Sequence, residues 1–392
     1  MSRVGMKAVI ITAVDPILCF VRGCEREMTA LIRQFVECES PSDHPPSVNR
    51  FVELVSDTAA PLAAVRSFAG GKFGKHLVCD MRLPGPRKAG RILALGHSDT
   101  VWPLGTLREM PFRKADGRLY GPGVYDMKAG IVFFLFAVRA LRELDIGVRS
   151  RVLLQLNSDE EVGSASSRAL TEKHASSSRA VLVLEPGTGA TGKLKTARKG
   201  VGGFRMVVHG KASHAGVNSE AGASAVVELA RQINRIAALA QPKRGITVNP
   251  GVISGGTRSN VVAAEAWAEI DIRVMRERDG AALEKQFRAL RPFDKRCSIE
   301  ISGGLNRPPM ERSAGGVRLF RMARKLAAEL GVDLEESLSG GGSDGNFTAA
   351  LGIPTLDGLG AVGEGAHAAN EHILMGRMAD RTALLAKLLA AL

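Results

Sequence analysis

Short apolar runs that stop at polar turns recur in the first half of the chain, and they predict buried β-strands. Three of these runs are RILAL at 91–95, VLLQL at 152–156 and AVLVL at 180–184. Segments with apolar residues at helical spacing occur before and between these runs, for example at 25–39 and 131–144. Strands that alternate with helices are typical of an α/β fold, so we predict a mainly parallel sheet flanked by helices.

The pattern changes after residue 198 and returns at about residue 311. Within this interval, strand patterns occur at 203–210, 245–254, 264–275 and 297–302, and helical patterns at 221–240 and 281–290. The order is β-α-β-β-α-β, which is that of a ferredoxin-like unit. We therefore predict a first domain at 1–198, an inserted α+β domain at 199–310, and the second part of the first domain at 311–392.

Potential metal ligands follow the three apolar runs of the first domain. They are His97 and Asp99, then Asp159, Glu160 and Glu161, then Glu185. Because the carboxyl ends of parallel strands meet at one edge of a sheet, we expect these side chains to lie close together. One histidine among several carboxylates suits zinc or a similar divalent ion, and the number of acids suggests two ions with a shared ligand. Each acid alone also fits a solvated turn.

Other polar residues leave two interpretations open. Asp126 lies within the glycine-rich segment 121–130, where the loop ends and a helical pattern begins, so it fits a helix N-cap as well as a ligand. His214 and Arg273 lie in the inserted unit and fit ordinary surface positions, although a guanidinium also matches a substrate carboxylate. The glycine-rich segment 339–347 offers N–H groups to an anion, but it lacks the lysine of a phosphate loop.

Composition narrows the class of protein. The 392 residues favour more than one domain, and the net charge of +13 raises the question of an anionic partner. Lys and Arg are spread along the chain and aromatic residues make up only 5%, so we expect a small anionic molecule and no nucleic acid. Five cysteines without metal or redox spacing indicate reduced thiols and a cytoplasmic location. No apolar run is long enough to span a membrane, and Asp15 and Pro16 interrupt the apolar N-terminal segment, which makes a poor signal peptide.

Eight short motifs occur in a fixed order along the chain. They are HSDTV at 97–101, GPGVYDMKAG at 121–130, SDEEVGS at 158–164, LEPG at 184–187, ASHAG at 212–216, SGGTRSNVV at 254–262, GGGSDG at 340–345 and HAANEHI at 367–373. Together they resemble the dinuclear zinc metallopeptidase family of glutamate carboxypeptidase, acetylornithine deacetylase and succinyl-diaminopimelate desuccinylase. The resemblance extends from about Met28 to the end of the chain and is closest to glutamate carboxypeptidase. It implies a zinc-exopeptidase-like catalytic domain whose ferredoxin-like insertion is a lid and dimerisation domain.

The resemblance also implies a metal site with two Zn²⁺ ions per subunit, with Co²⁺ or Mn²⁺ as alternatives. The residues that match the family's ligands are His97, Asp126, Glu161, Glu185 and His367. Asp126 would bridge the two ions, and its peptide bond to Met127 would be cis.

The catalytic roles implied by the resemblance fall on three further residues. Glu160 would be the general base for a zinc-bridged hydroxide, Asp99 would orient His97, and His214 would reach the oxyanion from the lid of a partner subunit. The substrate's free carboxylate would contact a set of lid and loop residues. These are Asn260, Arg273, Gly341, Gly342 and Ser343.

We therefore expect a homodimeric zinc-dependent hydrolase that cleaves an amide or peptide bond to release a C-terminal amino acid, with glutamate as the first candidate. An N-acyl-amino-acid deacylase of the acetylornithine deacetylase or desuccinylase type stays open, because the metal ligands do not discriminate between leaving groups. A non-catalytic metal- or peptide-binding protein is disfavoured by the presence of both Glu160 and His214.

Overall fold

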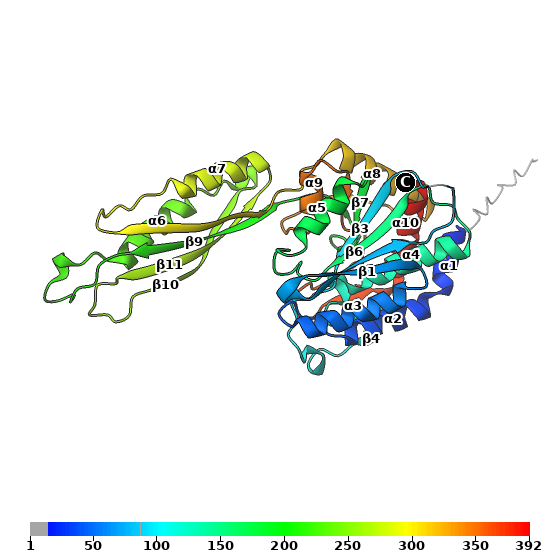
Figure 1. The fold of residues 1–392 in the computed structure, drawn as a ribbon, viewed down its shortest axis with the longest axis horizontal. Coiled ribbons are helices and arrows are strands. Elements are labelled where there is room, and N and C mark those ends of the chain that lie inside the picture. The colour runs from blue at the N-terminus through cyan, green and yellow to red at the C-terminus, as the bar shows by residue number, and fades with distance from the viewer. Residues whose placement is uncertain (1–14, 87) are drawn as a thin grey trace, which may run out of the picture.

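The computed structural model describes residues 15–86 and 88–392, which form two bodies joined by a narrow connection (Figure 1). The apolar segment that precedes Asp15 lies outside the described residues. The larger body, here called the main domain, is built around a six-stranded sheet, and the smaller around a four-stranded one. Among the described residues, no helix has the length and apolar character needed to cross a membrane.

The main sheet has the strand order β1-β2-β6-β3-β7-β14. Its strands are β1 (Ala63–Ala69), β2 (Lys75–Met81), β3 (Arg91–His97), β6 (Arg151–Asn157), β7 (Ala180–Val183) and β14 (Thr355–Leu356). Neighbours from β6 to β14 are parallel, while β1 and β2 add an antiparallel edge. The prediction of a mainly parallel sheet flanked by helices is confirmed.

Helices cover both faces of the main sheet (Figure 1). They are α1 (Pro16–Gly23), α2 (Glu25–Glu37), α3 (Pro45–Ala59), α4 (Ala129–Glu143), α5 (Arg168–Ser176), α8 (Ala314–Glu329), α9 (Gly345–Ala350) and α10 (Met378–Ala391). Along β3, Ile92 and Ala94 join the apolar cluster on one face, and Leu93 and Leu95 join the cluster on the other. Because both faces are buried, the strand reads as a continuous apolar run without alternation.

Helix α4 begins against the end of β7, which places it beside the candidate site. A Cβ on Gly130 would lie 2.3 Å from the carbonyl oxygen of Leu184, so only glycine allows this approach. The rest of α4 is almost wholly buried between its neighbours, as its sequence AGIVFFLFAVRAL suggests.

The inserted domain is an antiparallel sheet with the order β10-β11-β9-β12 and two helices on one face (Figure 1). Its elements are β9 (Gly200–His209), α6 (Ala225–Ala237), β10 (Thr247–Gly255), β11 (Glu265–Val274), α7 (Glu277–Arg288) and β12 (Ser298–Arg307). The order β-α-β-β-α-β agrees with the predicted ferredoxin-like unit. Strand β12 continues five residues past the predicted end at Ser302.

Two small sheets tie late segments of the main domain to earlier ones. One pairs β8 (Leu194–Arg198) with β13 (Glu336–Ser339). The other contains β4 (Arg113–Ala115), β5 (Arg118–Tyr120), β15 (Gly363–Glu364) and β16 (His372–Leu374). The pairing of β16 with β5 brings the segment after His367 next to the glycine-rich loop that follows β5.

Candidate active site

The carboxyl ends of the parallel strands gather ionisable side chains from distant parts of the chain. His97 is the last residue of β3, and Glu185 follows β7 by two residues. The Nε2 atom of His97 lies 3.2 Å from Oδ1 of Asp126 and 3.5 Å from Oε1 of Glu185. The prediction that strand ends bring these residues together therefore agrees with the structure.

A second half of the cluster forms around His367. Its Nε2 atom lies 3.4 Å from Oδ2 of Asp126 and 3.3 Å from Oε2 of Glu161. The two carboxylate oxygens of Asp126 thus face two different imidazoles, which is the placement that a bridging ligand requires. The alternative of a helix N-cap at Asp126 is wrong, because α4 begins at Ala129 and its N-cap residue is Lys128. The peptide bond from Asp126 to Met127 is cis.

The chemistry of this cluster fits divalent cations. Oε1 of Glu161 is buried and has no hydrogen-bond partner among the described residues, which is costly unless a cation is bound. Hydrogen bonds to Asp126 and Glu161 raise the pKa of His367 to about 10, which reflects an excess of negative charge. Ligand atoms of His97, Asp126 and Glu161 lie within 4.8 Å of one another. Imidazole nitrogens with carboxylates suit zinc and similar ions.

Asp99 contacts both the first histidine and the acidic turn. The Nδ1 atom of His97 lies 2.9 Å from the backbone carbonyl oxygen of Asp99 and 3.5 Å from its carboxylate. The carboxylate instead accepts hydrogen bonds from the backbone N–H groups of Glu160 and Glu161, at 3.2 and 3.1 Å, and from the Ser42 hydroxyl, at 2.8 Å. The carbonyl is thus the closer acceptor for the histidine, and the side chain holds the turn.

The three adjacent acids after β6 have separate environments. Oδ2 of Asp159 accepts hydrogen bonds from the N–H and the hydroxyl of Ser166, both at 2.7 Å, so this acid anchors the turn. Glu161 faces His367, whereas Oε1 of Glu160 accepts a hydrogen bond of 2.9 Å from Nη2 of Arg307. Burial raises the pKa of Glu160 well above its usual value.

Glu371 is a residue of the site to which the sequence assigned no role. It is fully buried, and its carboxylate accepts hydrogen bonds from the N–H groups of Gly123, Tyr125 and Asp126, at 2.8 to 3.0 Å. The indole N–H of Trp102 adds a fourth, at 2.7 Å. The sequence feature that could have indicated Glu371 is its place in the HAANEHI motif, four positions after the candidate ligand His367.

Arg198 is a second residue that the sequence did not single out. Its buried guanidinium donates hydrogen bonds to the carboxylate of Asp357, at 2.6 and 3.1 Å, and to the carbonyl groups of Gly341 and Gly342, at 3.1 Å. Its Nη2 atom also lies 3.5 Å from Oε2 of Glu185. Arg198 therefore connects a candidate ligand to the glycine-rich loop.

Only part of the glycine-rich segment that was expected to bind substrate is exposed to solvent. The hydroxyl of Ser343 is buried and donates to Asp357 at 2.7 Å, so it faces away from solvent. Gly341 is exposed and Gly342 is partly exposed. A ligand at this loop would therefore contact the two glycines.

The predicted site residues of the inserted domain are not part of the cluster in a single chain. His214, Asn260 and Arg273 belong to the body that stands apart from the strand ends in Figure 1. The side chain of Arg273 pairs with Asp271 on its own strand, with two N–H···O distances of 2.9 Å. His214 and Asn260 lie in neighbouring exposed loops, joined by a bridge between His214 and Val261.

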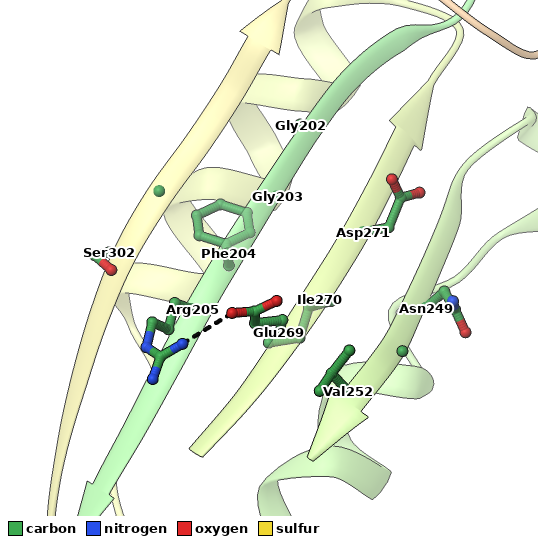
Figure 2. A pocket seen from close by; sticks show the side chains of 12 residues that line it. Gly202, Gly203, Phe204, Arg205, Asn249, Val252, Glu269, Ile270, Asp271 and Ser302 are labelled. Atoms are coloured by element: carbon green, nitrogen blue, oxygen red, sulfur yellow. Dashed lines mark hydrogen bonds and ion pairs between the residues drawn. The ribbon is translucent and has the colours of Figure 1, made fainter. Parts of the chain in front are cut away.

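A hollow of about 510 Å³ lies on the open face of the inserted sheet (Figure 2). Arg205 and Glu269 form an ion pair of 2.8 Å within it, and Phe204 and Asp271 also line it. None of the predicted site residues lines this hollow, and it lacks the grouped ligands of the strand ends. We therefore place the candidate active site at the strand ends.

Comparisons with known proteins agree with this geometry. Residues 93–391 match the model of the peptidase family M20/M25/M40. Carboxypeptidase G2 of Pseudomonas sp. (strain RS-16) is 31% identical over 284 residues, which cover 72% of this chain and 68% of that protein. Succinyl-diaminopimelate desuccinylase of Acidovorax ebreus (strain TPSY) is 27% identical over 300 residues, covering 72% and 75%. The crystal structure of aminopeptidase PepT from Bacillus cereus ATCC 10987 superposes with a TM-score of 0.78 at 22% identity, covering 93% of this chain and 98% of that one.

Proposed function

Because the chain belongs to the peptidase family M20/M25/M40, we propose that it releases a C-terminal amino acid, glutamate foremost, from a small amide or peptide. The family makes the chain a metallopeptidase or amidohydrolase with dinuclear metal binding. The observation that carries the proposal is Asp126 between two histidines, with Glu160 in the adjoining acidic turn. The similarity to carboxypeptidase G2 supports the release of a C-terminal amino acid, and the choice of glutamate comes from the motifs that resemble glutamate carboxypeptidase.

The proposed division of work follows from the contacts. His97, Asp126 and Glu185 would hold one divalent ion, and Asp126, Glu161 and His367 the other, with zinc as the proposed metal. When bound, the ions would polarise the scissile carbonyl and lower the pKa of the attacking water to roughly 7. Glu160 would take the proton of that water and later pass it to the leaving amine nitrogen.

The substrate's carboxylate would be held by Arg273 and Asn260 of the lid, together with the exposed backbone of Gly341 and Gly342. To bind it, Arg273 has to exchange or share its present partner Asp271. Since the lid residues stand apart from the metal cluster in one chain, we further propose a homodimer in which His214 of the partner subunit completes the site.

The test of the general base is Glu160→Ala, assayed with N-acyl-glutamates and with metal content measured by emission spectroscopy. We expect two metal ions per chain as in the wild type, and a turnover lowered roughly 100-fold or more. Asp126→Ala is the matched variant, and it should lose metal. Unchanged turnover in Glu160→Ala would refute the proposed role.

The alternative of an N-acyl-amino-acid deacylase is favoured by the similarity to succinyl-diaminopimelate desuccinylase. A substrate panel with and without chelator separates the two. Faster chelator-sensitive hydrolysis of N-succinyl-diaminopimelate or N-acetylornithine than of N-acyl-glutamates would select the deacylase.

The dimer is tested by mixing two inactive variants, Glu160→Ala and His214→Ala. If the histidine acts across the interface, half of the randomly formed dimers contain one intact site, so roughly a quarter of wild-type activity returns. A mixture as inactive as its components would contradict the exchange of His214 between subunits.

A further inference from the structure

Arg307 lies at the point where the chain leaves the inserted domain, and none of the motifs above includes it. It is the last residue of β12 and only 6% exposed. Its Nη2 atom is surrounded by oxygens: the Glu160 carboxylate at 2.9 Å, the Glu160 carbonyl at 2.9 Å, the Ser164 hydroxyl at 2.7 Å and the Asp344 carboxylate at 3.1 Å. One guanidinium nitrogen thus contacts both the side chain and the backbone of the candidate base.

The surroundings of Arg307 fix its guanidinium group. The ring of Phe347 lies beneath it, with 5.4 Å between the guanidinium carbon and the ring centroid. Asp344 is itself held by the side-chain amide of Asn157, at 2.6 Å, and by the Ser164 hydroxyl. These groups are buried and bonded to one another, which restricts the placement of the guanidinium.

The same strand end docks the lid onto the turn that carries the base. The amide of Asn306 donates to the carbonyl of Gly163 at 3.1 Å, and the carbonyl of Asn306 accepts from Arg168 at 3.3 Å. At Gly200, where the chain enters the inserted domain, a Cβ would lie 3.0 Å from the carbonyl oxygen of Arg307. The outgoing and returning strands are therefore packed against each other, so Arg307 stands on the stem of the lid.

We propose that Arg307 is a positioning residue: it holds the Glu160 carboxylate where it can exchange a proton with the attacking water, and it ties that placement to the stem of the lid. This inference rests on the proposed role of Glu160 as general base. A glutamate side chain has several rotatable bonds, and a misplacement of about 1 Å at a reacting group can lower a rate by about 100-fold. A fixed donor that reaches both the carboxylate and the backbone carbonyl of Glu160 removes this freedom.

The experiment compares Arg307→Ala and Arg307→Lys with Asn306→Ala in the full-length, metal-loaded protein. Asn306→Ala is the matched control, because it removes a stem contact to the same turn and the 3.2 Å hydrogen bond from Nη1 of Arg307, but leaves the contacts of Nη2 with Glu160 in place. We expect Arg307→Ala to lower kcat about 30- to 100-fold with KM and metal content near wild type. Arg307→Lys should fall between, since an ammonium keeps the charge but lacks the planar group that lies over the Phe347 ring. Asn306→Ala should stay within about threefold of wild type.

Two further measurements separate positioning from a general loss of structure. Added guanidinium ion should restore part of the kcat of Arg307→Ala, and the Arg307→Ala change should cost little more once Glu160 is already alanine. The proposal is overturned if kcat in the variant that combines Glu160→Ala with Arg307→Ala falls by the product of the two single losses. It is also overturned if kcat is unchanged in both Arg307 variants. A rise in KM confined to substrates with a free carboxylate overturns it too, because it would make Arg307 a substrate-binding residue. Failure of Glu160→Ala to lose activity would instead refute the proposed function itself.

Discussion

Replacing Glu371 by glutamine should weaken metal binding and the fold together. The carboxylate serves four buried donors, two at each oxygen, and an amide of the same shape can serve only two of them. Each donor left without an acceptor costs about 1–3 kcal/mol, so the loss lies at about 2–6 kcal/mol. Burial raises the pKa of Glu371 to about 7, so the ionised carboxylate carries a desolvation cost that a neutral amide avoids, and we expect the lower half of that range.

Part of this loss should appear in metal affinity. The N–H group of Asp126 is one of the four donors, so the backbone of the bridging carboxylate is held by Glu371. Removing the support of a ligand typically lowers metal affinity by 10- to 100-fold. The assays are urea unfolding of the metal-free protein and calorimetric titration with Zn²⁺.

A control variant, Trp102→Phe, removes only the indole donor and leaves the hydrogen bonds to Tyr125 and Asp126 in place. It should lower stability by about 1 kcal/mol and leave Zn²⁺ affinity unchanged. If Glu371→Gln kept both the wild-type unfolding midpoint and the wild-type Zn²⁺ affinity, the supporting role argued from these hydrogen bonds would be wrong.

Three other outcomes are expected. Arg273→Ala should raise KM about tenfold or more for substrates with a free carboxylate, and equal kinetics on the amidated analogues would contradict carboxylate binding. Gly130→Ala should destabilise the protein by about 1–3 kcal/mol, seen as a lower Tm, because its Cβ would lie 2.3 Å from the Leu184 carbonyl oxygen; an unchanged Tm would count against this packing. Burial raises the pKa of Cys79 to about 12, so Ellman's reagent at pH 8 should modify the exposed Cys19 and reach Cys79 only after unfolding; rapid labelling of Cys79 in native Cys19→Ser protein would refute this.

The strand ends could be predicted from sequence because burial on both faces leaves a visible signal. The apolar runs of β3, β6 and β7 stop where their ligands begin, and parallel strands place those ends at one edge. The assignment of roles to Asp126 and His367 came from the ordered motifs, because neither follows a long apolar run.

The residues that support the candidate ligands and the candidate base, Arg307 and Glu371, could not be predicted from such a pattern. Arg307 contacts Glu160 across 147 positions, and Glu371 contacts Tyr125 across 246. Single side-chain contacts over such separations create no periodic pattern. Strand β12 was predicted too short because the apolar pattern stops before Gly303 and Gly304; both have positive φ, yet the strand continues through them.

The order of the ligands along the chain has a consequence for biosynthesis. Four of the five candidate ligands precede the inserted domain, and His367 follows it near the carboxyl terminus. Under the proposed division of ligands, the residues of one ion site would all be synthesised before the inserted domain, whereas the other site would still lack His367, which lies just before β16 and its pairing with β5. Hydrolytic competence would thus be withheld from the nascent polypeptide until the segment that follows the inserted domain has been made.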